Sequence, residues 1–282
     1  MPSLQQLRRR LKGIRSIHQI TKAMEMIATS KMQKAIKKNL QSRGYSAMIS
    51  KISAPLLVYP HPLWESREIQ KVTILFITSN RGLCGGFNSN LLKTLTDFIK
   101  EHQNHQVEII TIGKKGRDYV ARLWPNILKA DFSDINEEIL YQEVTPVAHL
   151  ITEEYLQKET DAVFIIYNRF LSSFVQLPTV LQLLPFNPQQ ENVTQEECLL
   201  EPSPQQLLDL LIPRAIETQV YQALLESKAS EHSARMVAMS NARRNAEDLI
   251  DELYLTYHSM RQATITSELT DMISTKKAME EL

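Results

Sequence analysis

The sequence predicts a mixed α and β fold in which two long terminal helices bracket a central α/β domain. Only 7 of the 282 residues are glycine, far fewer than the ~7% of an average protein, so the chain can form few tight turns and long helices are favoured. Apolar residues recur at helical spacing near both ends of the chain, whereas short runs rich in Ile, Val and Phe lie between them. This change of period is typical of helices that flank a sheet.

We expect residues 1–57 to form one long helix. An apolar stripe with steps of three and four runs along its first half, as in a coiled coil: Leu4, Leu7, Leu11, Ile14, Ile17, Ile20, Met24 and Ile27. Pro55 and Pro60 mark its end. The first 24 residues are basic, as in a removable targeting leader, but the stripe continues past Glu25, so we interpret the segment as part of the helix.

Residues 58–204 are expected to form an α/β domain. Apolar runs predict buried strands at 71–78, 106–112 and 161–167, with a further strand at 174–184. Helical patterns lie between the runs, at about 88–103, 114–124 and 136–158. Alternating strands and helices predict a parallel sheet with right-handed crossovers.

Residues 205–282 are expected to form a second and longer helix, and Pro213 either kinks its first turns or marks its start. If the two terminal helices run antiparallel from the same side of the domain, residue 3 falls beside about residue 259. The rest of the longer helix then has no partner within the chain, although it carries Ile265 and Leu269. Exposed apolar surface usually marks an interface, so we expect another protein to hold this end.

The charges are strongly polarised, although the formal net charge is zero. Residues 1–51 carry 12 Lys and Arg against one acid, Glu25, and the rest of the chain carries the balancing excess of acids. Three roles for the basic helix remain open. It can bind nucleic acid, although no aromatic residue precedes Tyr45; it can be a solvated face; or it can complement an acidic protein collar.

Patterns for catalysis, metal binding and membrane insertion are absent from the sequence. Cys84 and Cys198 are isolated thiols, which supports neither a disulfide framework nor a zinc site. No apolar stretch approaches 18 residues, and no nucleophile turn or HExxH motif is present. The seven histidines lack metal-ligand spacing, and we interpret them all as incidental. We therefore expect no catalytic residue, no cofactor and no metal.

One loop, residues 80–88 (NRGLCGGFN), holds three of the seven glycines between a predicted strand and a predicted helix. A phosphate can meet backbone N–H groups at such a place, but the spacing is neither GxGxxG nor GxxxxGK[ST]. Three interpretations stay open: a structural turn, a contact with another subunit through Arg81, and a nucleotide site.

Three blocks of sequence carry a family resemblance: IHQITKAMEMIATSKMQKA at 17–35, TSNRGLCGGFN at 78–88, and ARMVAMSNARRNAEDLIDEL with RQATITSEL at 234–253 and 261–269. Together they resemble the gamma subunit of rotary proton-translocating ATP synthases, over essentially the whole chain. The sequence departs from the family's usual pattern at Asn80, at His258 and at the pair Lys276 and Lys277. The resemblance implies an antiparallel coiled coil that brackets a Rossmann-like α/β domain.

The resemblance also implies a function: a non-catalytic central rotor that couples proton flow through a membrane ring to ATP synthesis in an alpha–beta hexamer. The implied partners are the alpha, beta and epsilon subunits and the c-ring, with no nucleic acid and no membrane span of its own, at the cytoplasmic face of a bacterial inner (plasma) membrane. The implied contacts with beta are Lys22, Met24, Arg81, Arg261, Gln262, Thr266 and Glu268. Those with the ring are Cys198 and Glu201. The alternatives are a coiled-coil scaffold or nucleic-acid-associated structural protein and, third, an enzyme that uses the glycine loop.

Overall fold

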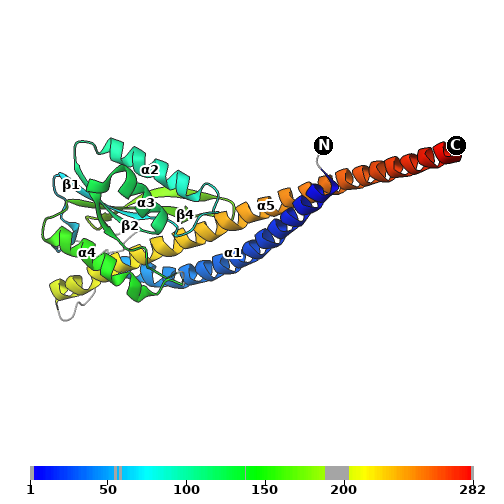
Figure 1. Cartoon of the computed structure of the whole chain (residues 1–282). Coiled ribbons are helices and arrows are strands. Elements are labelled where there is room, and N and C mark those ends of the chain that lie inside the picture. The colour runs from blue at the N-terminus through cyan, green and yellow to red at the C-terminus, as the bar shows by residue number, and fades with distance from the viewer. Residues whose placement is uncertain (1–2, 54–55, 57–58, 137, 188–202, 281–282) are drawn as a thin grey trace. The chain divides into compact units, whose positions relative to one another are not determined.

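The computed structural model of the chain describes residues 3–53, 56, 59–136, 138–187 and 203–280 (Figure 1). Along the chain, a central set of strands and shorter helices lies between two long helices, α1 (Leu4–Ser53) and α5 (Pro204–Glu280). The chain divides into two compact units. We call Met1–Ile27 with Met236–Leu282 the paired-helix unit, and Ala28–Arg235 the α/β unit. The predicted fold class of two long terminal helices around an α/β domain is confirmed.

A five-stranded sheet forms the centre of the α/β unit, in the order β3-β2-β1-β4-β5. Its strands are β1 (Lys71–Ile77), β2 (Gln106–Ile112), β3 (Leu128–Asp131), β4 (Ala162–Phe170) and β5 (Gln176–Leu184). The first four strands in this order pair in parallel, whereas β5 is antiparallel to β4. The link between β4 and β5 is too short for a parallel crossover, which needs a dozen or more residues, so these two strands form a hairpin.

Helices cover both faces of the sheet. The elements are α2 (Phe87–Glu101), α3 (Lys114–Leu123) and α4 (Thr145–Leu156), with the 3-10 turns η2 (Pro62–Trp64), η3 (Pro125–Ile127) and η4 (Tyr141–Glu143). Alternate residues of β1 show the two layers: Val72, Ile74 and Phe76 pack with α2 and α3, while Leu75 and Ile77 pack with α4 and the start of α5. Because both faces are buried, the strands read as continuous apolar runs.

Three predictions about the helices and strands need correction. The helix expected over 136–158 begins only at Thr145, because Pro146 lies in its first turn and η4 precedes it. The edge strand β3 was not predicted, since four residues are too few to show a period. Pro213 lies inside α5, which starts at Pro204, so the option that Pro213 marks the start of the helix is wrong.

The buried side of α1 follows a heptad seam, which differs from the predicted apolar stripe. The buried and half-buried positions step by four and three: Leu7, Leu11, Ile14, His18, Thr21, Glu25, Ala28, Met32, Ala35 and Asn39. The predicted stripe leaves this seam at Ile17, and Ile17, Ile20 and Ile27 are 53%, 59% and 56% exposed. The prediction was wrong there because polar residues occupy several seam positions, and hydrophobicity alone does not mark them.

Candidate functional site

The glycine loop between β1 and α2 is held by its own hydrogen bonds. The Ser79 hydroxyl donates to the Arg81 carbonyl oxygen at 2.7 Å, and the Asn88 amide nitrogen lies 2.7 Å from the same hydroxyl. Leu83 and Gly85 have positive φ angles of 61° and 55°, a conformation that turns require. Burial raises the pKa of the Cys84 thiol, so this cysteine is unreactive at neutral pH.

Helix α5 closes the loop from outside. The Arg235 guanidinium donates to the carbonyl oxygens of Arg81 and Gly82 at 3.3 and 3.4 Å, and the Ser230 hydroxyl donates to the Asn168 carbonyl at the end of β4. The cavity at the carboxyl ends of β1 and β2 is only about 10 Å³, about the space of one water. These contacts support the structural turn and leave no room for a nucleotide. The Arg81 side chain itself is exposed.

A buried charge cluster on α5 supports this closure, and the sequence did not reveal it. Glu231 lies 3.0 Å from the Lys228 ammonium and 2.8 Å from the Arg235 guanidinium. Burial acts to raise the pKa of Glu231, but Lys228, Arg235 and His232 outweigh it and hold the pKa below its usual value. Burial lowers the pKa of His232 to about 4, so the ring is neutral at physiological pH. His232 is therefore not incidental. The signal in the sequence was four charged or titratable residues within eight positions of one helix.

The turn between β2 and α3 is held by the close approach of its backbone to the backbone of Thr78. Gly113, between β2 and α3, has a φ of +107°, and a Cβ atom there would lie 2.3 Å from the Thr78 carbonyl oxygen. The Thr78 hydroxyl accepts from the Gly116 N–H at 2.8 Å. Asn80, where the family usually has Asp, accepts from the Lys114 N–H at 3.0 Å. The amide oxygen thus supplies the acceptor that a carboxylate would supply.

Replacing Gly113 with alanine is expected to destabilise the chain by at least about 3 kcal/mol, because the strained φ and the backbone clash add. Gly13→Ala is the matched control. Nothing lies within 4 Å of a Cβ atom at that helical position, so we expect a gain of about 0.5–1 kcal/mol. Denaturant unfolding of the full chain measures both. Equal stability of the two variants would contradict the close approach.

The paired-helix unit is antiparallel, as predicted. Leu7 and Leu11 of α1 pack against Leu253 of α5. The Arg8 guanidinium donates to the Tyr257 hydroxyl at 3.0 and 2.8 Å. Further along the unit, the charged groups of Glu25 and Arg243 lie 3.0 Å apart. Residues later in α1 therefore contact residues earlier in α5, as antiparallel helices require.

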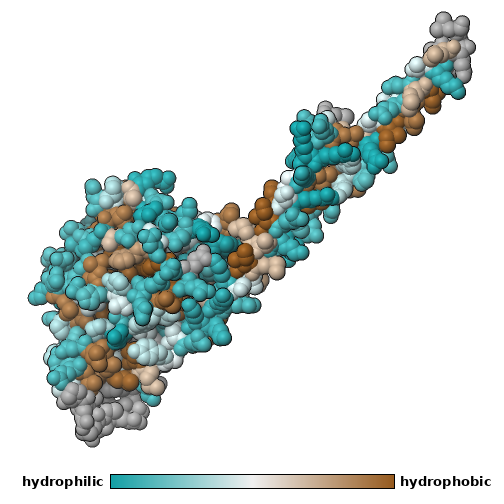
Figure 2. All heavy atoms as spheres, turned by 60° about the horizontal axis from the view of Figure 1, so that its bottom comes forward, coloured by the Kyte–Doolittle hydropathy of each residue, from teal (hydrophilic) through white to brown (hydrophobic). Residues whose placement is uncertain are grey.

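Helix α5 continues beyond Met260, which packs against the cluster of Leu7, Leu11 and Leu253. Every side chain from Arg261 to Lys276 is exposed, and Figure 2 shows apolar surface along this part of the helix. The apolar members, 43–66% exposed, are Ile265, Leu269, Met272 and Ile273. The predicted overhang, which begins at about residue 259, is confirmed.

The exposed end of α5 is two-sided. At 3.6 residues per turn, about half of its circumference holds the four exposed apolar residues together with Arg261, Gln262, Thr266 and Glu268. We call this the mixed face. The other half holds small or polar residues: Thr264, Ser267, Thr270, Asp271 and Ser274. A face that combines apolar side chains with a few charged and amide groups has the composition of a protein interface.

The residues predicted to contact a beta subunit do not converge on one site. Lys22 is exposed and Met24 is half-buried, and they lie on different faces of α1. Arg261 and its neighbours lie on the exposed end of α5, and Arg81 lies in the α/β unit. Cys198 and Glu201, the predicted ring contacts, lie outside the described residues.

Residues 3–279 match the protein family described as ATP synthase. The chain is 42% identical to the ATP synthase gamma chain of Pelotomaculum thermopropionicum and 41% identical to that of Dehalococcoides mccartyi, each over 99% of this chain and all of the relative. The chain belongs to the ATP synthase gamma-chain family. The resemblance carried by the three sequence blocks is thereby confirmed.

Solved structures agree with this assignment. The chain superposes with a TM-score of 0.62 and 26% identity on a chain of the Tetrahymena thermophila mitochondrial ATP synthase central stalk and c-ring, covering 79% of this chain and 99% of that one. A chain of the Euglena gracilis mitochondrial ATP synthase gives a TM-score of 0.68 at 22% identity, over 98% and 94% of the two chains, and shares the fold.

A gamma chain is the rotor subunit of a membrane-associated complex and is not catalytic by itself. Among the residues that the structure describes, no helix is both long and apolar enough to cross a bilayer. The same residues contain no group of three His, Cys, Asp or Glu side chains placed to hold a metal ion.

Proposed function

We propose that this gamma chain turns inside an alpha–beta hexamer and couples proton flow through a c-ring to ATP synthesis, with the epsilon subunit bound to its α/β unit. We place it at the cytoplasmic face of a bacterial inner membrane, because the relatives named above are bacterial gamma chains. The Tetrahymena structure that it resembles is a central stalk with its c-ring, which supports the same set of partners.

The mixed face of α5 is the observation that carries this proposal. A free helix end that exposes Leu269, Met272 and Ile273 at more than half of their surface needs a protein around it. Arg261 on the same face offers five donors in a planar fork, which suits a carboxylate or several carbonyls of a beta subunit.

The paired helices present different chemistry in different directions, which a coupling shaft requires. Ile17, Ile20 and Ile27 form an exposed apolar stripe on α1, while the basic residues Arg15 and Lys22 are exposed on the opposite side of the same helix. A rotor biases the nucleotide affinity of a beta subunit only if its contacts differ between rotary positions. An asymmetric shaft provides such differences, because each beta subunit meets another face in turn.

Further contacts belong to this proposal. Arg81 is exposed on a loop whose backbone is fixed by α5, and it would reach a beta subunit. Cys198 and Glu201 would meet the c-ring at the foot of the rotor, as the family resemblance implies.

Reconstitution tests the proposed function directly. The chain is mixed with the alpha and beta subunits of its host, and a fluorescent bead is attached through an introduced cysteine at Thr94 on α2. We expect ATP-driven, unidirectional bead rotation. An alpha–beta complex that hydrolyses ATP at full rate while the bound chain does not rotate would overturn the rotor assignment.

Met24→Lys is expected to make the coupling less efficient. The added ammonium pairs with an acidic beta loop in some rotary positions, and such a charge-assisted contact is worth about 1.5–3 kcal/mol. We expect protons pumped per ATP hydrolysed, measured in inverted vesicles, to fall to about half or less. Met26→Lys is the control, because Met26 is 66% exposed on a different face of α1. Unchanged pumping in the Met24 variant would show that this face of the shaft does not meet the loop.

A further inference from the structure

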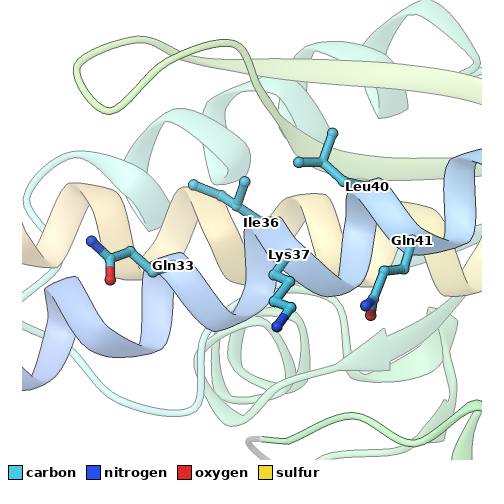
Figure 3. Close-up of a pocket in the computed structure, with 5 residues that line it drawn as sticks. All are labelled: Gln33, Ile36, Lys37, Leu40 and Gln41. Atoms are coloured by element: carbon cyan, nitrogen blue, oxygen red, sulfur yellow. The ribbon is translucent and has the colours of Figure 1, made fainter.

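A basic cavity of about 450 Å³ lies within the α/β unit and takes no part in the rotor contacts described above. Its walls come from α1, from α5 and from the segment that precedes η4. The residues that line it are Lys31, Lys34, Ala35, Lys37, Lys38, Gln41, Glu138, Ile139, Leu225, Lys228 and His232. Figure 3 shows a different pocket on α1, lined by Gln33, Ile36, Lys37, Leu40 and Gln41, of which Lys37 and Gln41 also line the basic cavity.

Among the residues that the structure describes, the lining carries five lysines against one carboxylate, that of Glu138. The lysines converge because helical positions three and four apart share a face, and because Lys228 of α5 faces the same cavity as the four lysines of α1. Like charges gathered around one space repel each other, so this arrangement becomes favourable when an anion of several charges occupies the space.

The contacts of Lys34 and Lys38 leave these two lysines able to bind an anion. Lys34 and Glu138 are 3.3 Å apart, but their side chains are 68% and 73% exposed, and a pair of this kind contributes little stability. Lys38 donates to the backbone carbonyl of Ile139, at 3.3 Å. An anion with oxygens in the cavity can replace both contacts at small cost.

The wall contributed by α5 is fixed in place before any ligand arrives. Lys228 is held by Glu231 at 3.0 Å, and its side chain is only 12% exposed. The Arg235 guanidinium lies 3.2 Å from the Nδ1 atom of His232. Since arginine can only donate, Nδ1 accepts, and the neutral ring carries its proton on Nε2. The wall therefore offers preorganised donors, which lowers the ordering cost of binding.

From this geometry we propose that the basic cavity is a binding site for a small molecule with a polyphosphate chain, such as a nucleoside triphosphate or an inorganic triphosphate. Ammonium groups on flexible stems are common phosphate ligands, and the volume lies in the range of small-molecule pockets. The excess of lysines over carboxylates suits an anion of several charges. Ala35, Ile139 and Leu225 add an apolar side against which a nucleoside can pack. A volume of about 450 Å³ suits one small ligand better than an acidic protein segment.

Calorimetric titration of the isolated full-length chain tests this site without interference from the catalytic sites of beta subunits. The probes are inorganic tripolyphosphate, ATP, orthophosphate and a ten-residue polyglutamate peptide. We expect saturable 1:1 binding of tripolyphosphate and ATP, with orthophosphate at least about tenfold weaker because it engages fewer lysines. Tighter binding of ATP than of tripolyphosphate would show that the nucleoside also contacts the cavity. Saturable binding of ATP without binding of tripolyphosphate would overturn recognition through the phosphate chain.

The Lys34→Gln, Lys38→Gln double variant should bind tripolyphosphate at least about tenfold more weakly than the wild type. The matched control is Lys12→Gln, Lys51→Gln, which removes the same charge from exposed positions of the same helix outside the cavity, and its Kd should stay within about twofold. Lys37→Gln, at an exposed position, provides a second probe if the double variant does not fold. No saturable binding to the wild type, an equal loss in both double variants, or polyglutamate binding more tightly than tripolyphosphate would overturn the proposal.

Discussion

Replacing Arg261 and Gln262 together with alanine is expected to lower the ATPase turnover of the reconstituted alpha–beta–gamma complex about tenfold or more, or to prevent assembly. Both residues lie on the mixed face of α5, beside exposed Ile265 and Leu269. A charge-assisted hydrogen bond contributes about 1.5–3 kcal/mol, and a loss of 1.4 kcal/mol is a factor of ten. The contact with a beta subunit forms in only some rotary positions. Its loss therefore removes a difference in free energy between those positions and the others.

Two controls separate this interface from general effects on α5. Thr264→Ala with Ser267→Ala changes the opposite, polar half of the same helix, and deletion of the residues after Lys276 removes an end that lacks the sequence block. Both should be milder than the Arg261 and Gln262 double variant. Full turnover of that double variant in the assembled complex would contradict the assignment of the mixed face to a beta contact, but it would leave the fold unaffected.

Glu231→Gln is expected to cost about 3–5 kcal/mol of unfolding free energy, because it leaves two cations buried without their counter-charge. Lys228 and Arg235 are only 12% and 11% exposed, and Arg235 also closes the glycine loop. Glu247→Gln is the matched control: Glu247 pairs with Arg243 at the same spacing of four residues, but is 59% exposed, so its loss should cost less than about 1 kcal/mol. Urea unfolding of the full chain measures both. Similar losses would show that the cluster around Glu231 does not hold the α/β unit together.

The same cluster is expected to make the folded chain less stable as the pH falls. The folded pKa of His232, about 4, lies below its ordinary 6.5, so the unfolded chain binds more protons between these values and stability falls as the pH drops through this window. Glu231 adds to the loss at lower pH. Its folded pKa also lies below the ordinary 4.5, so its contribution is complete above 4.5 and disappears as the pH falls through the folded value. His232→Gln should flatten the loss between pH 6.5 and 4 in unfolding experiments.

Local patterns were sufficient to predict most of the fold. Few glycines and stripes of apolar residues predicted the two long helices, and the apolar runs at 71–78 and 106–112 predicted buried strands, because these signals depend on near neighbours in the chain. Relative helix lengths alone predicted that α5 extends past the start of α1. The same counting placed Arg261 beyond the start of α1, and the family resemblance made it a candidate contact.

Only the tertiary structure decided which polar residues are buried. Glu25 lies on the seam of α1, where it pairs with Arg243 of α5 at 3.0 Å, while the more apolar Ile17 and Ile20 are exposed. The cluster around Glu231 pairs within one helix, since Lys228 and Arg235 lie three and four residues away, but Arg235 is also bound by the glycine loop, which is far away in the sequence. The physical reason is common to both cases. Hydrophobic periodicity reports what one helix can bury by itself, whereas the burial of a charge depends on a counter-charge or hydrogen-bond partner that only the folded chain brings within reach.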